Sequence, residues 1–438
     1  MEIDKFTFND LSIFNSEESF SVFHKLNFTR TSEGREWLIK FFKEPLGDLQ
    51  TIRDTQQILR LIIQKEKEWP TYITNGTIMV IYKFYEYAVD EYPDRANLLN
   101  SAIYRLLHRH DYSLTRFSLT HIVDFIKGVS AFPGIFTSES TPAFLLHYIN
   151  RIEQILNRPE IAELLNIESA NELSPAESLA LGYFFRNQFK NQLLELIQIF
   201  SRLDAYYSMA IAVKTHNLCF PEFIEQDQPL IEADRLYHLL LERPVAYDTR
   251  LDPSHNFLFL TGANMAGKST YIKSVGTAVF LAHLGMGVPA RAFKLTMFSG
   301  LLSNIQVEDN IVKGESYFFN EVQRIKNTIL KINDNRKWLI LIDELFKGTN
   351  VQDAMKCSTT VIKGLIRIKH SLFILSTHLY EIGEELKVFP NISFRYLETT
   401  VKNGQLSFSY QLKEGVSNDR IGYLILQREK VVELLERL

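Results

Sequence analysis

Residues 257–270, FLFLTGANMAGKST, decide the fold of the second half of the chain. An apolar run leads into GANMAGKS (262–269), which fits the pattern G-x4-G-K-[ST], and a helical run follows over Thr270–Leu284. Glycines let the loop backbone turn its N–H groups toward phosphates, and the following helix N-terminus adds positive potential. The pattern therefore predicts a phosphate-binding loop in which Lys268 reaches the β- and γ-phosphates and Ser269 offers a hydroxyl to Mg²⁺. A chance match in an ordinary strand–loop–helix unit is the alternative.

Two further apolar runs, Trp338–Ile342 and Leu372–Leu375, have the composition of buried parallel strands. The first is followed by Asp343 and Glu344, and the second by Ser376-Thr377-His378. Asp343 is expected to hold Mg²⁺ through water, Glu344 to polarise the attacking water, and His378 to sense the γ-phosphate. The alternatives are a solvated acid pair at a strand end and a structural histidine.

The first half of the chain, up to about residue 220, has helical apolar spacing. Ser178–Thr215 predicts a single long helix, because it contains no proline and its apolar residues recur at helical intervals. Asn157–Glu177 is polar and contains Pro159 and Pro175, which predicts a short helix followed by a loop.

After residue 222 short strands alternate with helices. Phe257–Leu260 is the first clear buried strand of this half, and two alternating segments near the end, 392–401 and 406–412, predict an antiparallel hairpin. Arg420–Leu438 returns to helical spacing. The expected fold class is α + α/β, with an all-helical domain over 1–222 and an α/β ATPase domain over 223–438.

The composition is that of a globular protein with large cores. The chain has 438 residues, 46% hydrophobic and 23% charged, with no apolar run long enough for a membrane span. The N-terminus, MEIDKFTFND, lacks the basic and apolar regions of a signal peptide. The two cysteines, Cys219 and Cys357, have no zinc-site spacing. These features favour a cytoplasmic protein without a membrane association.

The charge is unevenly distributed between the two halves. Residues 1–250 contain 25 Lys and Arg against 34 Asp and Glu, or −9, whereas residues 251–438 contain 23 against 18, or +5. The acidic half gives no support to a simple nucleic-acid groove, because phosphate neutralisation needs clustered Lys and Arg.

Four motifs closely resemble those of the MutS family, the ATPases of DNA mismatch repair. In the family's order they are TGANMAGKSTYIKSVG (261–276), GESYFFNE (314–321), LIDELFKGTN (341–350) and LSTHLYEI (375–382). The first is far more specific than the generic phosphate-loop pattern. Fainter resemblances to the family's core and lever helices lie at Arg30–Gly34, Pro45–Asp48 with Ile52-Arg53, and Phe200–Asp204.

The resemblance implies a site for ATP and Mg²⁺. Its implied nucleotide-binding residues are Gly262, Asn264, Met265, Ala266, Gly267, Lys268, Ser269 and Thr270, with Ser316 acting in trans. Ser269 and Asp343 are the implied metal ligands, and Glu344, Lys268 and His378 the implied catalytic residues. A serine acting in trans implies a homodimer with two composite sites.

The resemblance also indicates a short form of the family. The core-like segment begins near residue 10, which leaves no room for the mismatch-reading and connector domains. The polar stretch Asn157–Glu177 falls at the place of the family's clamp and is far too short to be one.

Some residues depart from the family pattern. Ala263 replaces a usual proline, and Phe346 and Lys347 occupy a turn that usually has small residues and arginine. The aromatic residue that stacks on adenine aligns with Val245, so Tyr247 is the candidate to replace it.

Two features of the first half have ordinary explanations. Phe84-Tyr85-Glu86 matches the Phe-x-Glu of mismatch-reading proteins, but it lies in a helical stretch of the core-like region, which favours coincidence. A basic cluster interleaved with tyrosines is either a solvated helix face or a DNA contact. Its members are Arg105, His108, Arg109, His110 and Arg116.

The sequence thus predicts a dimeric MutS-like ATPase with DNA as its partner, in mismatch repair or a related DNA transaction. The first alternative is an ATP-switched factor that binds a protein or branched DNA and does not read mismatches. The second is a protein that binds the nucleotide without turnover, against which the intact Lys268, Asp343 and Glu344 argue.

Overall fold

The structure is a computed structural model that describes residues 1–89, 92–93, 97–136, 141–167, 170–305, 317–402, 405–417 and 430–436. The chain forms two compact units. Unit 1 comprises Met1–Lys25, Glu44–Arg53 and Thr215–Leu438, and unit 2 comprises Leu26–Lys43 and Asp54–Lys214. Each unit is built from segments that alternate along the sequence, whereas the predicted division has a single boundary after residue 222. Helices and a sheet rich in parallel strands make the fold mixed α/β, compatible with the predicted class.

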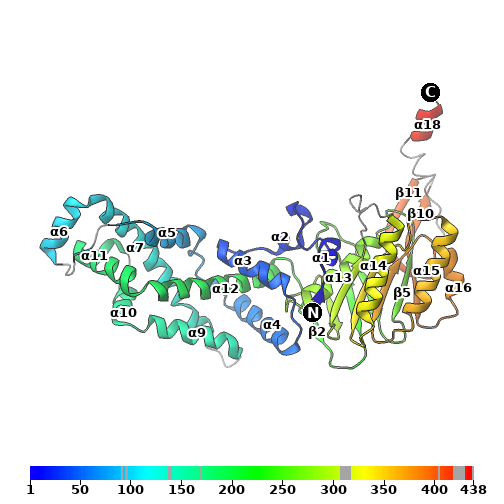
Figure 1. The fold of residues 1–438 in the computed structure, drawn as a ribbon, viewed down its shortest axis with the longest axis horizontal. Helices are drawn as coiled ribbons and strands as arrows, with labels where there is room; N and C mark the ends of the chain where they lie inside the picture. The colour runs from blue at the N-terminus through cyan, green and yellow to red at the C-terminus, as the bar shows by residue number, and fades with distance from the viewer. Residues whose placement is uncertain are drawn as a thin grey trace. The chain divides into compact units, whose positions relative to one another are not determined.

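Unit 1 is built on a seven-stranded sheet of order β1-β7-β8-β9-β5-β10-β11 (Figure 1). The strands are β1 (Glu2–Ile3), β5 (Phe257–Thr261), β7 (Gly300–Asn304), β8 (Trp338–Asp343), β9 (Leu372–Ser376), β10 (Ile392–Lys402) and β11 (Gln405–Glu414). Neighbouring strands are parallel except the β10–β11 hairpin. The three predicted parallel strands and the hairpin are therefore confirmed, and β5, β8 and β9 are neighbours with every residue buried.

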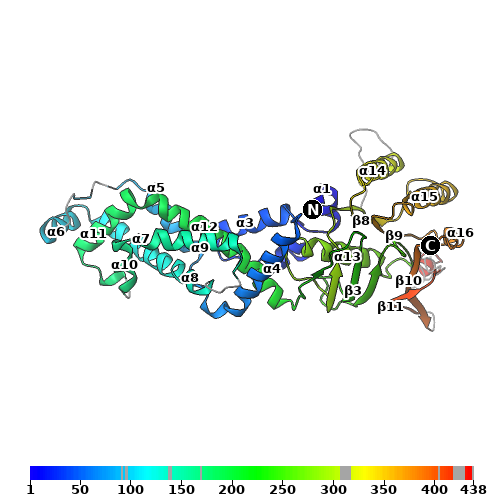
Figure 2. The same cartoon turned by 90° about the horizontal axis from the view of Figure 1, so that it is seen from below.

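Alternate residues of these strands pack on different helices, as expected for buried strands. Phe257, Ile340 and Phe373 belong to a core with residues of α14, α15 and α16, whereas a methyl group of Leu341 lies close to Gly276 of α13. Figure 2 shows α14 and α15 on one side of the strands and α13 on the other. The helices of unit 1 are α1 (Lys5–Asp10), α13 (Lys268–Ala282), α14 (Tyr317–Ile332), α15 (Val351–Leu365), α16 (Glu381–Leu386) and α18 (Val431–Glu436), with α2 (Val22–Leu26) at its border. A second sheet has the order β2-β6-β3-β4, with β2 (Glu222–Phe223), β3 (Ile231–Leu236), β4 (Tyr247–Leu251) and β6 (Ala292–Leu295).

The described residues of unit 2 form helices and short helical turns and no strand. The α-helices are α3 (Ser32–Lys43), α4 (Leu49–Gln64), α5 (Asn75–Glu86), α6 (Leu98–Leu107), α7 (Arg109–Val129), α8 (Phe132–Ile135), α9 (Ala143–Leu156), α10 (Pro159–Asn166), α11 (Pro175–Tyr183) and α12 (Lys190–Thr215). Among the described helices of the chain, none is long and apolar enough to cross a membrane.

The prediction of one continuous helix over Ser178–Thr215 is wrong. A π-helical turn at Phe184–Gln188 separates α11 from α12. Phe184, Phe185 and Phe189 are all buried, and the rings of Phe184 and Phe189 stack at 5.2 Å. A π-turn brings residues five apart into line along the helix, so the wider turn lets these phenylalanines enter the core together. The predicted short helix in 157–177 is confirmed as α10.

Two segments that resemble the MutS core, near Arg30 and near Asp204, meet inside unit 2. The fully buried Asp204 on α12 accepts hydrogen bonds from the N–H groups of Arg30 (3.0 Å) and Thr31 (2.9 Å) and from Thr31 Oγ1 (2.7 Å). Gly34 is required beside it, because a β-carbon there would lie 2.1 Å from Asp204 Oδ2. Asp204 therefore ties the start of α3 to α12.

Asp204→Ala is expected to lower the free energy of unfolding of unit 2 by about 3 kcal/mol, because it leaves two backbone N–H groups and a hydroxyl buried without an acceptor. The measurement is urea unfolding followed by tryptophan fluorescence, to which Trp37 and Trp69 of this unit contribute together with Trp338 of unit 1. Glu195→Ala on the same helix is the control, because Glu195 pairs with Arg151 at the surface and should contribute at most about 1 kcal/mol. Equal losses for the two variants would contradict the role of Asp204.

Candidate functional site

The glycine-rich loop 262–267 connects β5 to α13 in an unusual backbone conformation. Gly262 has φ +139° and Gly267 has φ +99°, and Met265 between them has φ +69°. A β-carbon on Gly262 would lie 3.1 Å from the carbonyl oxygen of Leu397. Glycine is thus required at 262 both by its backbone angle and by the close approach of β10.

Lys268, the first residue of α13, is buried in this loop. Its Nζ donates to the carbonyl oxygens of Gly262 (2.9 Å) and Ala263 (3.0 Å) and lies 3.2 Å from His378 Nε2. Burial lowers the pKa of Lys268 to about 8, against the opposing pull of the Glu344 and Asp343 carboxylates. A buried ammonium that is held by carbonyl oxygens at a loop of this kind is suited to a polyanion.

Asp343 joins the ends of three elements. It is the last residue of β8 and is 8% exposed, and its two carboxylate oxygens accept hydrogen bonds from Ser269 Oγ on α13 and from Ser376 Oγ on β9. The expected pairing of Ser269 with Asp343 is therefore present in the structure. Because these are oxygen donors, the pair has the chemistry that Mg²⁺ prefers.

Glu344 is held by the side chains of His378 and Lys347. Its Oε1 lies 2.8 Å from His378 Nε2, and its Oε2 lies 3.2 Å from Lys347 Nζ. Burial raises the pKa of Glu344, but the hydrogen bonds and charges of His378 and Lys347 outweigh it and lower the pKa to about 2. The structure thus brings the three expected catalytic residues, Glu344, Lys268 and His378, into one cluster.

The turn after Glu344 has a strained backbone. Glu344 and Phe346 have φ angles of +63° and +61°, a region that large side chains rarely adopt. Phe346, which departs from the family pattern, is 4% exposed and its ring lies 5.7 Å from that of Phe318 on α14. The buried carboxylate of Glu321, also on α14, accepts from the N–H groups of Lys347 (3.1 Å) and Gly348 (3.2 Å). Helix α14 therefore holds the turn. The sequence analysis placed Glu321 in the GESYFFNE motif but did not predict this role for it.

The other expected nucleotide-binding residues line the same loop. Asn264, Met265 and Ser269 are exposed, Thr270 is half-buried and Ala266 is buried. Ser316 lies outside the described residues.

Two tyrosines flank the loop near Gly267. A β-carbon built on Gly267 would lie 3.3 Å from Tyr410 Cδ1 and 3.7 Å from the hydroxyl oxygen of Tyr247. Tyr247 is the expected substitute for an adenine-stacking aromatic, but it is 5% exposed, whereas Tyr410 on β11 is 39% exposed. The sequence analysis missed Tyr410, because an aromatic in a hairpin strand gives no sign of lying beside a loop more than 140 residues away.

Comparison with known proteins shows which family this part of the chain resembles. Residues 258–433 match the family described as MutS domain V. This part of the chain is similar to the MutS family. The resemblance found in the sequence motifs is thereby confirmed.

The curated relatives of the chain include DNA mismatch repair proteins from bacteria and fungi. The chain is 27% identical over 240 residues to MutS of Staphylococcus haemolyticus, covering 53% of this chain and 27% of that protein. It is 29% identical over 266 residues to msh3 of Aspergillus fumigatus, covering 56% and 24%, and 25% identical over 256 residues to MutS of Petrotoga mobilis, covering 57% and 31%. The matched segment thus spans less than a third of the length of these relatives.

Proposed function

We propose that this chain is a MutS-like ATPase whose nucleotide state controls binding to DNA. The observation that supports the ATPase most directly is the cluster of Lys268, Glu344 and His378 beside the Ser269–Asp343 pair. Its location at the carboxyl ends of β5, β8 and β9 is where parallel sheets bind their ligands. The names of the relatives support DNA as the partner and mismatch repair or a related DNA transaction as the setting.

In this proposal each residue of the cluster has its own task. The phosphates replace the carbonyl oxygens of Gly262 and Ala263 as partners of Lys268, and Asn264 and His378 contact the γ-phosphate. A Mg²⁺ ion held by Ser269 and Asp343 would supply positive charge to the β- and γ-phosphate oxygens. Glu344 orients the attacking water rather than removing its proton fully, because a carboxylate with a pKa of about 2 is a weak base.

The proposed ATPase is a homodimer with composite sites. Ser316 of one subunit would complete the site formed by Gly262–Thr270 of the other, as the G-x-S-x-F-x-x-E motif of the family implies. The helices of unit 2 would carry the change of nucleotide state to the DNA.

Glu344→Gln is expected to retain ATP binding and to lower the rate of hydrolysis about 100-fold or more, because a neutral amide accepts a weaker hydrogen bond from the attacking water than a carboxylate does. The measurement is single-turnover conversion of radiolabelled ATP to ADP, together with the nucleotide retained on the protein. Lys268→Ala should bind no ATP at the same concentration. Wild-type protein that binds ATP without turning it over would establish the non-hydrolysing alternative, and a Glu344→Gln variant as fast as wild type would remove Glu344 from the mechanism.

A surface of unit 2 supports a second candidate function, binding of a protein partner. Helix α6 exposes most of its large aliphatic side chains, with Leu98 at 82%, Leu106 at 79% and Leu107 at 71% exposure. A groove beside it is lined by three arginines, Arg105, Arg109 and Arg116, and no acidic residue lines it among those that the structure describes. These arginines are part of the predicted basic cluster. Aliphatic side chains gain nothing from a phosphate backbone, whereas they would bury area against an acidic amphipathic helix.

Two double variants of this surface, one that reverses charge and one that removes apolar side chains, distinguish DNA binding from binding of a protein partner. If α6 contacts DNA, Arg105→Glu with Arg109→Glu should weaken binding to duplex, G·T-mismatched or four-way-junction DNA and reduce its salt dependence, and Leu99→Ser with Leu106→Ser should leave DNA binding unchanged. Fluorescence anisotropy with ADP and with a non-hydrolysable ATP analogue measures both. No binding to any of the DNA structures in either nucleotide state would contradict the DNA proposal and favour the protein partner.

A further inference from the structure

The first ten residues of the chain are part of the ATPase-bearing unit. β1 is the edge strand of the seven-stranded sheet and pairs in parallel with β7, with Glu2 opposite Gly300 and Ile3 opposite Leu301. Asp4 then caps α1 by accepting a hydrogen bond from the N–H of Thr7 (2.8 Å), and Thr7 Oγ1 accepts from the N–H of Ser303 (2.9 Å). The segment is therefore held by backbone and side-chain contacts to a strand almost 300 residues away.

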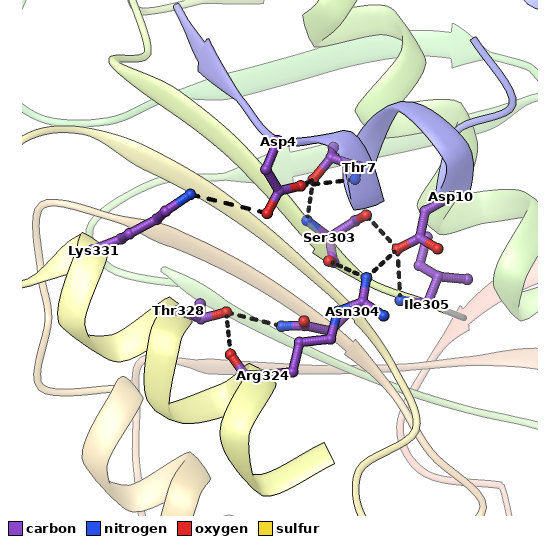
Figure 3. A network of polar contacts seen from close by, with 9 residues as sticks. All are labelled: Asp4, Thr7, Asp10, Ser303, Asn304, Ile305, Arg324, Thr328 and Lys331. Carbon is purple, nitrogen blue, oxygen red and sulfur yellow. Dashed lines mark hydrogen bonds and ion pairs between the residues drawn. The ribbon is translucent and has the colours of Figure 1, made fainter. Parts of the chain in front are cut away.

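Asp10, the last residue of α1, forms the centre of this contact (Figure 3). It is 2% exposed, and one carboxylate oxygen accepts from Ser303 Oγ (2.5 Å), the N–H of Ile305 (3.0 Å) and Arg324 Nη2 (3.0 Å). The same Nη2 donates to the carbonyl oxygen of Ser303 (3.0 Å). Asp10 thus fixes the end of β7 and a guanidinium of α14 in one buried network, where charged hydrogen bonds are strong and expensive to break.

Helix α14 continues from this network to the active-site turn. Glu321 lies three residues before Arg324, so both side chains project from neighbouring turns of one helix face. Glu321 holds the backbone of Lys347 and Gly348, and Lys347 lies 3.2 Å from the carboxylate of Glu344. A connected series of contacts therefore runs from Asp10 through α14 to Glu344.

We propose that Asp10 is a positioning residue for Glu344, acting through Arg324, α14 and Glu321 within the same subunit. The inference rests on the proposed ATPase, in which Glu344 orients the attacking water. It gives the N-terminal segment a part in turnover, because removal of the charge at residue 10 weakens the hold of β7 and α1 on the Arg324 guanidinium of α14. Small displacements of a group that orients a reactant have large effects on the chemical step.

Asp10→Asn keeps the size of the side chain and removes the charge that holds Arg324. We expect a kcat at least tenfold below wild type, with the Kd for a non-hydrolysable ATP analogue within twofold, because Lys268 and the loop 262–267 are untouched. Glu2→Gln is the matched control: Glu2 in the same segment pairs with Arg336 at 2.5 Å, but both side chains are about half exposed, and its kcat should stay at the wild-type value. Should Asp10→Asn not fold, Arg324→Gln carries the same expectation, since it leaves Asp10 bonded to Ser303 and Ile305.

Mixing of subunits tests whether Asp10 acts within its own subunit. Asp10→Asn mixed with Lys268→Ala should not recover activity, because each composite site then has a defect in the subunit that binds the nucleotide. Ser316→Ala mixed with Lys268→Ala should recover part of the wild-type turnover, which tests the composite dimer independently. Failure of only that second mixture would count against the proposed dimer and leave the role of Asp10 standing.

Three results would overturn the inference. Recovery of activity in the Asp10→Asn and Lys268→Ala mixture would show that Asp10 acts on the partner's site. If Asp10→Asn weakened binding of the ATP analogue enough to explain its lower turnover, Asp10 would act on nucleotide binding rather than on Glu344. A kcat unchanged in both Asp10→Asn and Arg324→Gln would show that the network has no part in catalysis.

Discussion

The arrangement of the site depends on the hydrogen bonds that the Asp343 carboxylate accepts. Ser269 and Ser376 donate to its two oxygens, so one buried charge joins the end of β8, the end of β9 and the first turn of α13. The following residue is fixed as well, because the N–H of Glu344 donates to the carbonyl oxygen of Ser376 (2.9 Å) and its backbone takes a positive φ. The Glu344 carboxylate is thereby presented to His378 and Lys347.

Two titratable groups in the cluster around Asp343 have shifted pKa values. Burial lowers the pKa of Lys268 to about 8, and the interactions with His378 and Lys347 lower the pKa of Glu344 to about 2 in spite of its burial. Both pKa values thus lie well below the usual values of these groups, and large shifts of neighbouring titratable groups are characteristic of catalytic and ligand-binding sites. The strained turn after Glu344 fits the same interpretation, because unfavourable backbone angles persist only where surrounding contacts hold them, and here Glu321 and Phe318 do so.

Local patterns in the sequence were sufficient to predict the strands and which polar residues follow them at the carboxyl edge of the sheet. Apolar runs bounded by polar residues located β5, β8 and β9, and their parallel pairing brought Lys268, Glu344 and His378 together as expected. What the sequence could not predict depends on contacts between distant segments. The two-residue strand β1 is too short to have a hydrophobic pattern. Asp10 resembles any acidic residue at a helix end, and its contact with Arg324 is visible only in the fold. The π-turn at Phe184–Gln188 depends on how three phenylalanine rings pack together. Ser316 stays a prediction.

Calorimetric titration with MgATP at pH 7 and pH 9, in buffers of different ionisation enthalpy, tests the central claim that Lys268 receives the phosphates. With a pKa of about 8 in the free protein, Lys268 is mostly charged at pH 7 and mostly neutral at pH 9. Phosphates beside it raise its pKa, so binding should take up almost no proton at pH 7 and about one per nucleotide at pH 9. Absence of binding, or the same proton uptake at both pH values, would contradict the account.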